Sequence, residues 1–248
     1  MKCIILAGGY AKRLWPLTLW RAKPLLKVNE KPLIDYMIKK LEKIKEIDEI
    51  LISTNMRFEK SFNQWLKNSK FKKKIRIIIE QTGSEKEKLG AIKAIQFLIE
   101  REKMKDDIII IAGDNLFDFK IEDFIRFSKG KSSCSIAVFD IKDLEKAKLY
   151  GNIVFDDDYK ITEFVEKPPA PKSTFVSTVC YFIPKRIVGI FSKYIAGGNP
   201  KDAPGYFIQW LYKREGVFAF VFNGHWFDIG DKSSLEAARR FMREVEKD

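Results

Sequence analysis

The segment Cys3-Ile-Ile-Leu-Ala-Gly-Gly-Tyr-Ala-Lys-Arg-Leu-Trp-Pro-Leu-Thr18, followed by Arg21-Ala-Lys-Pro24, carries the strongest signal in this chain of 248 residues. An apolar run ends in Gly8 and Gly9, and the residues that follow supply two cations, Arg13 and Lys23. A buried strand that opens into glycines lets backbone N–H groups approach a phosphate, because glycine has no Cβ. The segment therefore predicts a β-strand that leads into a phosphate-binding loop.

Apolar, β-branched runs alternate with stretches of helical periodicity along most of the chain. Strands are expected at 2–7, 49–53, 75–80, 107–112 and 134–139, and amphipathic helices at 33–46, 57–68, 88–104 and 121–129. Beyond residue 150 we expect a hairpin, a strand at 175–182, helices near 184–195 and 203–214, a strand at 217–222 and a helix from 231. Continuous apolar strands are typical of sheets covered on both faces. The pattern predicts a three-layer, Rossmann-like α/β fold with a central, mostly parallel mixed sheet.

The composition, 46% hydrophobic and 32% charged, suits a single α/β domain over 1–248, with a first half to about 140 and a second half over 141–248. No apolar run approaches the length of a transmembrane helix, and the apolar start reads as a strand rather than a signal peptide. Cys3, Cys134 and Cys180 are scattered and read as buried residues in a reducing cytoplasm. The single histidine, His225, excludes a multi-histidine metal site.

The formal net charge of +12 raises the possibility of nucleic-acid binding. Lysines are interspersed with acidic residues, and the run Lys70-Phe71-Lys72-Lys73-Lys74 precedes a strand. Such dispersed charge is typical of a solvated surface rather than of a nucleic-acid patch. A basic surface also favours the capture of anionic small molecules such as nucleotides and sugar phosphates.

Two aspartates stand where a hard cation could be held. Asp114 follows an apolar strand and Gly113, and Asp228 lies in Trp226-Phe-Asp-Ile-Gly230. The carboxyl ends of parallel strands are where ligands of open sheets bind. Two carboxylates brought together there would hold Mg²⁺, although either one alone could be a cap or turn residue. The triplet Asp156-Asp157-Asp158 lies between alternating strands and predicts a hairpin turn rather than a metal motif.

Read in order, these elements resemble the sugar-phosphate nucleotidylyltransferases, also called nucleotide-sugar pyrophosphorylases. The resemblance covers nearly the whole chain and implies a fold of the nucleotide-diphospho-sugar transferase type, without a C-terminal β-helix. It implies a transferase of nucleotide-sugar biosynthesis that converts a nucleoside triphosphate and a sugar-1-phosphate into a nucleotide-sugar and pyrophosphate. It also implies Mg²⁺ on Asp114 and Asp228, with Arg13 and Lys23 as the catalytic cations.

The resemblance implies two groups of ligand-binding residues. The nucleotide would contact Leu6, Ala7, Gly8, Gly9, Lys12, Gln81 and Gly90. The sugar phosphate would contact Tyr150, Gly151, Glu166 and Lys167, with Glu166 on sugar hydroxyls and Lys167 on the phosphate. Because a glutamine amide can pair with the edge of thymine or uracil, we expect dTTP or UTP as the nucleotide. We expect glucose-1-phosphate as the sugar.

Four positions depart from the family pattern. Ala11 and Lys12 replace a usual glycine and a usual Thr or Ser, Val179 replaces a glycine that many members have beside the sugar, and Pro24 follows Lys23 where many thymidylyltransferases have glutamine. These departures leave open a mannose-1-phosphate guanylyltransferase or a catalytically weak regulatory paralogue. For partners we expect the two substrates, no nucleic acid and no membrane, and we leave open a homo-oligomer.

Overall fold

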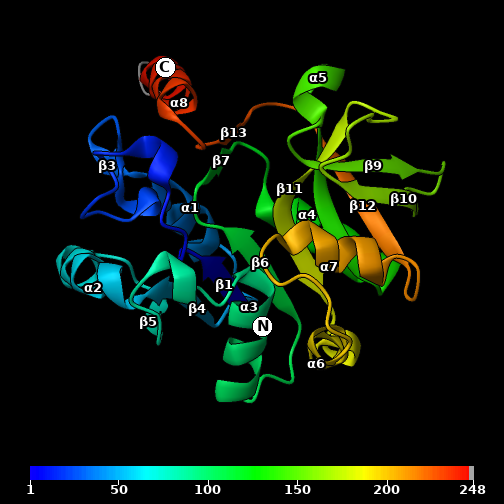
Figure 1. The fold of residues 1–248 in the computed structure, drawn as a ribbon, viewed down its shortest axis with the longest axis horizontal. Coiled ribbons are helices and arrows are strands. Elements are labelled where there is room, and N and C mark those ends of the chain that lie inside the picture. Colours follow the sequence, from blue (N-terminus) through cyan, green and yellow to red (C-terminus); the bar gives the residue numbers. More distant parts are fainter. Residues whose placement is uncertain (246–248) are drawn as a thin grey trace. The chain divides into compact units, whose positions relative to one another are not determined.

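The computed structural model describes residues 1–245, in which strands and helices alternate along most of the chain (Figure 1). Contacts divide the chain into two compact units. The N-terminal unit contains residues 2–88, 111–118 and the segment from 224; the central unit contains Met1, 89–110 and 119–223. Each unit is thus assembled from segments that are distant in sequence. The division into halves near residue 140 stays a prediction.

The N-terminal unit is built on parallel strands. Its elements are β1 (Lys2–Leu6), β2 (Lys27–Val28), β3 (Lys31–Pro32), α1 (Leu33–Glu42), β4 (Glu49–Asn55), α2 (Glu59–Asn68), β5 (Lys74–Glu80), β7 (Asn115–Phe117), β13 (Trp226–Asp228) and α8 (Lys232–Val245), with 3₁₀ turns η1 (Lys12–Leu14), η2 (Lys23–Leu25), η3 (Met56–Phe58) and η4 (Glu85–Glu87). Strand β4 lies between β1 and β5 and is parallel to both. Every residue of β4 is buried, as the apolar run predicts.

One core cluster of this unit connects its first and last segments. Its buried residues include Leu14 of η1, Leu33 of α1, Leu116 of β7, Ile229 just after β13, and Leu235 of α8. The cluster packs the loop after β1 against the chain that follows β13. Hydrophobic burial therefore holds the neighbours of Arg13 and Asp228 in the same part of the unit.

The central unit has a mixed sheet. Its elements are α3 (Ala91–Arg101), β6 (Ile108–Ala112, which continues into the N-terminal unit), α4 (Ile121–Lys131), β8 (Cys134–Asp140), α5 (Leu144–Ala147), β9 (Gly151–Phe155), β10 (Ile161–Glu166), β11 (Phe175–Ile183), η5 (Lys185–Ile187), α6 (Ile190–Ala196), α7 (Pro204–Leu211) and β12 (Val217–Phe222). Strand β9 pairs antiparallel with β10 and β11, β11 pairs antiparallel with β8, and β8 pairs parallel with β12. The parallel strands β1, β4 and β5 of the N-terminal unit belong to the same sheet. The expected α/β fold with a central, mostly parallel mixed sheet is confirmed.

Several expected elements differ at their ends. The helix expected at 33–46 ends at Glu42, because the next residues form tight turns such as Ile44 N–H to the Leu41 carbonyl. The helix expected at 88–104 begins at Ala91, because Gly90 has a φ of 80°, outside the helical region. The helix expected at 184–195 is a 3₁₀ turn at 185–187 followed by α6. The sequence pattern does not predict the short strands β2, β3, β7 and β13 or the short helix α5.

The aspartate triplet forms the predicted hairpin turn between β9 and β10. The Asp156 carboxylate accepts hydrogen bonds from the backbone N–H groups of Asp158 and Lys160, 3.1 and 2.9 Å away. The three cysteines are free and buried, as expected, and burial raises the pKa of Cys3 and Cys134. Within residues 1–245 no helix is both long and apolar enough to cross a bilayer.

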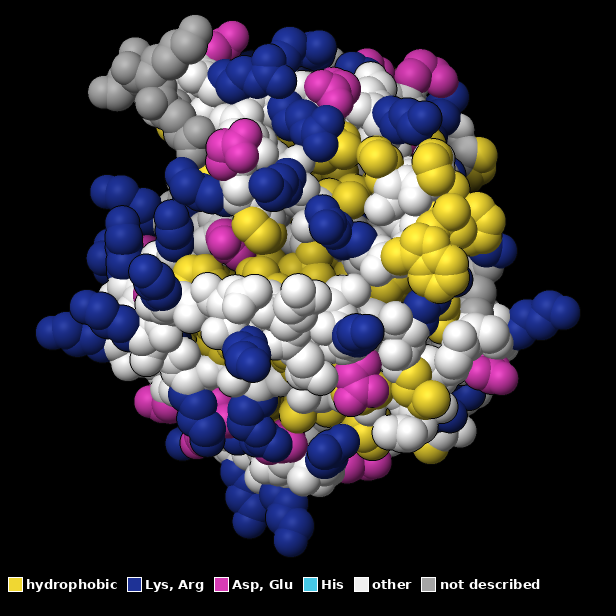
Figure 2. Space-filling view, turned by 90° about the vertical axis from the view of Figure 1, so that its left-hand side faces the viewer, with side chains coloured by type: hydrophobic (Ala, Val, Ile, Leu, Met, Phe, Trp, Pro, Cys, Tyr) yellow, Lys and Arg dark blue, Asp and Glu magenta, His cyan; other side chains and the backbone are white. Residues whose placement is uncertain are grey.

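Lysine and arginine side chains are spread over the face shown in Figure 2, with acidic and uncharged side chains among them. They do not gather into one continuous basic stripe on that face. This distribution agrees with the interpretation of the +12 charge as a solvated surface.

Candidate active site

The loop after β1 is held by the last residues of β4. The Ala7 N–H donates to the Ser53 carbonyl at 2.8 Å, and the Thr54 hydroxyl donates to the Ala7 carbonyl at 3.2 Å. The Asn55 side-chain amide donates to the Gly8 carbonyl at 2.8 Å. These bonds fix the expected phosphate loop at the carboxyl edge of the parallel strands, where open α/β sheets bind ligands.

Gly8 leaves room for a buried carboxylate. A Cβ at Gly8 would lie 2.7 Å from Oε1 of Glu80, the last residue of β5. That same oxygen accepts a hydrogen bond from the Ser53 hydroxyl at 2.9 Å. Burial raises the pKa of Glu80, and the Ser53 hydrogen bond opposes this effect. Gly8 is therefore needed for close packing of the loop against Glu80.

The turn after the two glycines contains the first departure from the family pattern. Ala11 has φ 46° and ψ 47°, in the left-handed region that favours glycine, and its carbonyl accepts a hydrogen bond from the buried Thr18 hydroxyl at 2.8 Å. Alanine at such a position costs about 1–2 kcal/mol of backbone strain. Ala11 thus adopts a backbone conformation that is typical of glycine. The exposed residues Lys12 and Arg13 follow Ala11 in η1.

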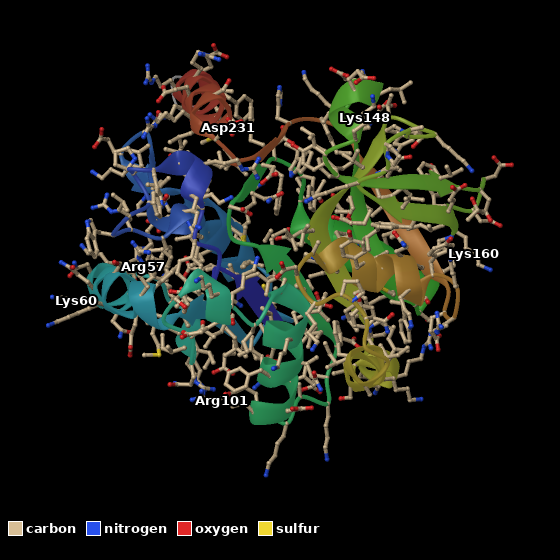
Figure 3. All side chains as sticks on the ribbon, viewed as in Figure 1. Arg57, Lys60, Arg101, Lys148, Lys160 and Asp231 are labelled. Carbon is tan, nitrogen blue, oxygen red and sulfur yellow. The ribbon has the colours of Figure 1, made fainter. Side chains whose placement is uncertain are left out.

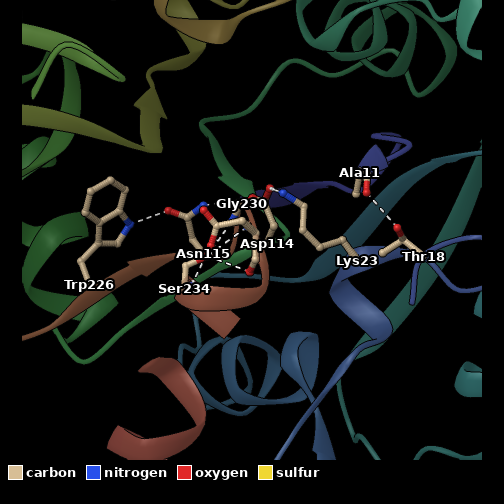
Figure 4. A network of polar contacts seen from close by, with 9 residues as sticks. Ala11, Thr18, Lys23, Asp114, Asn115, Trp226, Gly230 and Ser234 are labelled. Atoms are coloured by element: carbon tan, nitrogen blue, oxygen red, sulfur yellow. Dashed lines mark hydrogen bonds and ion pairs between the residues drawn. The ribbon is translucent and has the colours of Figure 1, made fainter. Parts of the chain in front are cut away.

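Lys23 and Asp114 form the central ion pair of the N-terminal unit (Figure 4). The Lys23 Nζ lies 2.5 Å from Asp114 Oδ2, and the two side chains are only 15% and 25% exposed. The other carboxylate oxygen accepts a hydrogen bond from the Asn115 amide at 3.0 Å. Asn115 in turn accepts from the Trp226 indole N–H at 2.5 Å. Asp114 is therefore fixed in orientation from two sides.

The ribbon of β7 and β13 brings the backbone that carries Asp228 next to the backbone that carries Asp114. Asp228 pairs with Asn115 in this antiparallel ribbon, and the Ile229 N–H donates to the Asp114 carbonyl at 3.1 Å. Helix α8 starts immediately afterwards with Asp231 as its cap, labelled in Figure 3. The pKa of Asp231 is lowered first by its hydrogen bond to the Ser234 N–H and further by other contacts that include the charge of Arg13. The expected residues Arg13, Lys23, Asp114 and Asp228 are thus gathered in one unit.

Asp114 and Asp228 are the two carboxylates that the sequence predicts for a magnesium ion. Among the described residues no group of three or more His, Cys, Asp or Glu side chains could hold a metal. Mg²⁺ is usually held by one or two carboxylates and completed by phosphate oxygens and water. Asp114 and Asp228 carry oxygen donors of this kind on hydrogen-bonded backbone segments, and a magnesium ion held by both stays a prediction.

The expected sugar-phosphate residues are gathered in the central unit. Glu166 pairs with Gly151 across β10 and β9, and the Lys167 N–H donates to the Tyr150 carbonyl at 3.0 Å. A Cβ at Gly151 would lie 2.4 Å from Phe164 Cζ and 3.0 Å from Glu166 Oε2. Burial raises the pKa of Glu166, and the charge of Lys167 partly offsets this. The glycine is required here because two side chains occupy the space of its Cβ.

The two residues expected to read the base fall in different units. Gln81 is exposed and follows β5 in the N-terminal unit. Gly90 belongs to the central unit, where a Cβ would lie 2.5 Å from the Lys201 carbonyl oxygen. The positive φ of Gly90 and its closeness to Lys201 explain why this position requires glycine, and no contact with a ligand is needed for that explanation. Base reading by this pair stays a prediction.

Val179, the departure expected near the sugar, also has the conformation of a glycine. Its φ is 51°, which is rare for a β-branched residue. It lies where the pairing of β11 with β8 is interrupted, between Ser177 and Tyr181. The buried Thr178 hydroxyl anchors this irregular stretch to the Ala137 carbonyl at 3.0 Å. Strained backbone of this kind is common at ligand sites.

Sequence reasoning missed the side chains that hold the loops. Besides Asn55 and Asn115, Arg57 donates to the Leu19 carbonyl from two nitrogens, at 3.0 and 2.6 Å, and lies over the Trp20 ring (Figure 3). Arg57 lies in the 3₁₀ turn that follows β4, so its position near the carboxyl edge of a strand was an available signal. Its target, a loop carbonyl about 40 residues away, could not be read from local patterns.

Known proteins resemble this chain over nearly its whole length. The model of the family described as nucleotidyl transferase matches residues 2–245. This chain belongs to the nucleotidyl transferase family. Relatives of this nucleotidyl transferase include the bifunctional protein GlmU of Methanocaldococcus jannaschii, 28% identical over 98% of this chain and 54% of the relative. The glucose-1-phosphate thymidylyltransferase of Neisseria meningitidis is 28% identical over 99% of this chain and 84% of the relative.

Solved structures support the fold of this nucleotidyl transferase. A provisionally named glucose-1-phosphate thymidylyltransferase from Bacillus anthracis, in complex with a sucrose, has a TM-score of 0.82 at 27% identity, covering 98% of this chain and 95% of that chain. A UDP-glucose pyrophosphorylase complexed with UDP-glucose has the same TM-score at 20% identity, which supports the fold alone. The chain spans little more than half the length of several relatives, such as the GlmU protein at 54%.

Proposed function

We propose that this nucleotidyl transferase couples a nucleoside triphosphate to a sugar-1-phosphate. The observation that carries the proposal is the set formed by the Gly8-Gly9 loop, Lys23 and the adjacent Asp114 and Asp228 within one unit. Cations beside backbone glycines and paired carboxylates match the needs of a triphosphate and its metal ion. Glu166 and Lys167 of the central unit would bind the sugar phosphate.

In the proposed reaction a phosphate oxygen of the sugar-1-phosphate attacks the α-phosphorus of the triphosphate. A P–O bond forms there, and the bond to the β-phosphate bridging oxygen breaks, so that pyrophosphate leaves with its electron pair. No covalent enzyme intermediate is needed, and catalysis consists of positioning and charge stabilisation. Lys23 would offset charge on the α-phosphate, Arg13 on the departing pyrophosphate and Lys167 on the nucleophile.

Asp114 and Asp228 would hold Mg²⁺, which when bound neutralises phosphate charge and orients the triphosphate. Asn115 fixes the Asp114 carboxylate through its amide, and Trp226 fixes Asn115. This arrangement restricts Asp114 to the side facing Lys23, so the protein's own cation and the metal ion would act at the same carboxylate.

For the substrates we propose a pyrimidine nucleotide, dTTP or UTP, and glucose-1-phosphate. The similarity to a glucose-1-phosphate thymidylyltransferase over 99% of the chain supports this choice. A mannose-1-phosphate guanylyltransferase is the second candidate, since that enzyme of Arabidopsis thaliana is 27% identical over 100% of the chain. The Gln81 amide could pair with a thymine or uracil edge, which favours the first candidate.

Pyrophosphate release measured across a matrix of four NTPs and several sugar-1-phosphates tests the proposal. We expect release only when an NTP, a sugar-1-phosphate and Mg²⁺ are all present. Asp114→Asn and Asp228→Asn should each lower turnover by orders of magnitude. Asp123→Asn, which alters an exposed helix aspartate paired with Arg126, serves as the matched control. A folded but silent wild-type protein would overturn the enzyme proposal and favour a regulatory paralogue.

A further inference from the structure

The first turn of helix α7 packs against the end of strand β10 in the central unit. Gly205 and Gln209 are four residues apart on α7, so they share one face of the helix. Both of them contact Glu166, the last residue of β10. Helix α7 therefore contacts Glu166 at two points, the carboxylate through Gly205 and the backbone N–H through Gln209, and the sequence pattern singled out neither residue.

Gly205 provides the space for the Glu166 carboxylate. A Cβ at Gly205 would lie 1.7 Å from Glu166 Oε2 and 2.6 Å from Cδ. Oε2 also lies 3.0 Å from the Cβ position of Gly151 on the neighbouring strand. The carboxylate is thus enclosed between two glycines. Any side chain at either glycine would move the carboxylate, because the carboxylate is the flexible end of its side chain.

Gln209 holds the backbone of the same residue. Its Oε1 accepts the hydrogen bond of the Glu166 N–H at 2.8 Å. The next residue, Lys167, has a φ of 50°, so the strand turns away directly after Glu166. Gln209 therefore fixes the point from which both the Glu166 side chain and the Lys167 turn depart.

The Glu166 carboxylate itself is available to a ligand. Within residues 1–245 no side chain donates a hydrogen bond to it, whereas its backbone N–H is bonded. Burial raises the pKa of this carboxyl group. A partly buried carboxylate that accepts no hydrogen bond from a side chain can accept hydrogen bonds from the hydroxyl groups of a ligand.

We propose that Gln209 is a positioning residue that sets the affinity for the sugar phosphate by fixing Glu166. The inference rests on the proposed function, in which Glu166 accepts hydrogen bonds from sugar hydroxyls. Gln209 acts through Glu166 and not on the nucleotide. Its removal changes the binding of one substrate only.

The test uses the full chain and the best substrate pair from the matrix above. Gln209→Met keeps the size of the side chain and removes the acceptor, while Gln209→Glu keeps an acceptor oxygen. The matched control is Gln96→Met, which removes an exposed helix glutamine bonded to Glu100 at 2.9 Å. Gly205→Ala is compared with Gly130→Ala, because a Cβ at Gly130 meets nothing within 4 Å.

For Gln209→Met we expect the KM for the sugar phosphate to rise roughly tenfold or more, while the KM for the NTP stays within about twofold. Gly205→Ala should show the same split, and Gln209→Glu should recover part of the loss. Both controls should behave like wild type. An equal rise in both KM values, or no rise in either, in a variant with native thermal stability overturns the inference. A wild-type protein that is silent throughout overturns the proposed function instead, and this inference with it.

Discussion

The Lys23 ammonium lies 2.5 Å from the carboxylate of Asp114, one of the two residues proposed to hold a magnesium ion. Asn115 holds the second oxygen of Asp114 at 3.0 Å, so the carboxylate cannot turn away without losing that bond. Lys23 and a metal ion would therefore compete for Asp114. Two cations near one carboxylate repel each other, and this repulsion lowers the affinity of the site for the metal.

Replacing Lys23 with Met should raise the affinity for Mn²⁺, used as a spectroscopic probe, by roughly tenfold, because a competing charge is removed. The same variant should lose most of its turnover, because the charge on the α-phosphate is no longer offset. Mn²⁺ titration followed by electron paramagnetic resonance measures the first effect without any substrate. Lys172→Met, which breaks the exposed pair with Glu163, should leave Mn²⁺ binding unchanged. Weaker Mn²⁺ binding by Lys23→Met would contradict competition.

Glu80→Gln should stabilise the protein at neutral pH. Burial raises the pKa of Glu80, so the folded state binds its proton more tightly than the unfolded state, whose pKa is about 4.3. Stability is therefore lost as the pH rises from the unfolded pKa through the folded pKa. The glutamine keeps an acceptor for the Ser53 hydroxyl and cannot ionise. Urea unfolding between about pH 4 and 8 should show a flatter profile for Glu80→Gln. Glu236→Gln, on an exposed helix position, should keep the wild-type profile.

Thr18→Val should loosen the turn that carries Lys12 and Arg13. The buried Thr18 hydroxyl donates to the Ala11 carbonyl, and its loss should cost about 1 kcal/mol of unfolding free energy. NTP affinity, measured by calorimetry, should fall several-fold in parallel. The same exchange at the exposed Thr162, whose hydroxyl meets the Val154 carbonyl at 3.2 Å, should change stability by less than about 0.5 kcal/mol. Equal effects at both threonines would show that the Ala11 bond has no special role.

Val179→Gly should leave stability nearly unchanged. Glycine removes the strain of the left-handed conformation, which stabilises the folded state by about 1–2 kcal/mol. This gain offsets the loss of a partly buried side chain and the larger conformational entropy of glycine in the unfolded chain. Val165→Gly, at another half-buried strand position, has no such strain to relieve and should cost about 1–2 kcal/mol more than Val179→Gly. Thermal unfolding of the pair measures this difference. A similar loss in both variants would mean that Val179 is not strained.

Local patterns determined a large part of this protein. The apolar run before Gly8 predicted β1, and the alternation of strands and helices predicted the α/β fold. The predicted ends of helices were less accurate where the backbone conformation of one residue determines them, as at Gly90 with its positive φ. The glycine loop, Asp114, Glu166 and Asp228 follow one another in an order that resembles the family pattern, and the family model matches residues 2–245.

Tertiary structure alone decided which residues act on which. Three contacts join segments that are far apart in sequence: the ion pair of Lys23 with Asp114, the hydrogen bond of Trp226 to Asn115, and the hydrogen bond of the Glu166 N–H to Gln209. Sequence periodicity reports which face of an element is buried, since burial depends on the residue itself and its near neighbours. Periodicity does not show which residue a side chain contacts, because that contact depends on how distant segments pack. The contacting residue in turn determines the orientation of the side chain and the charge beside it.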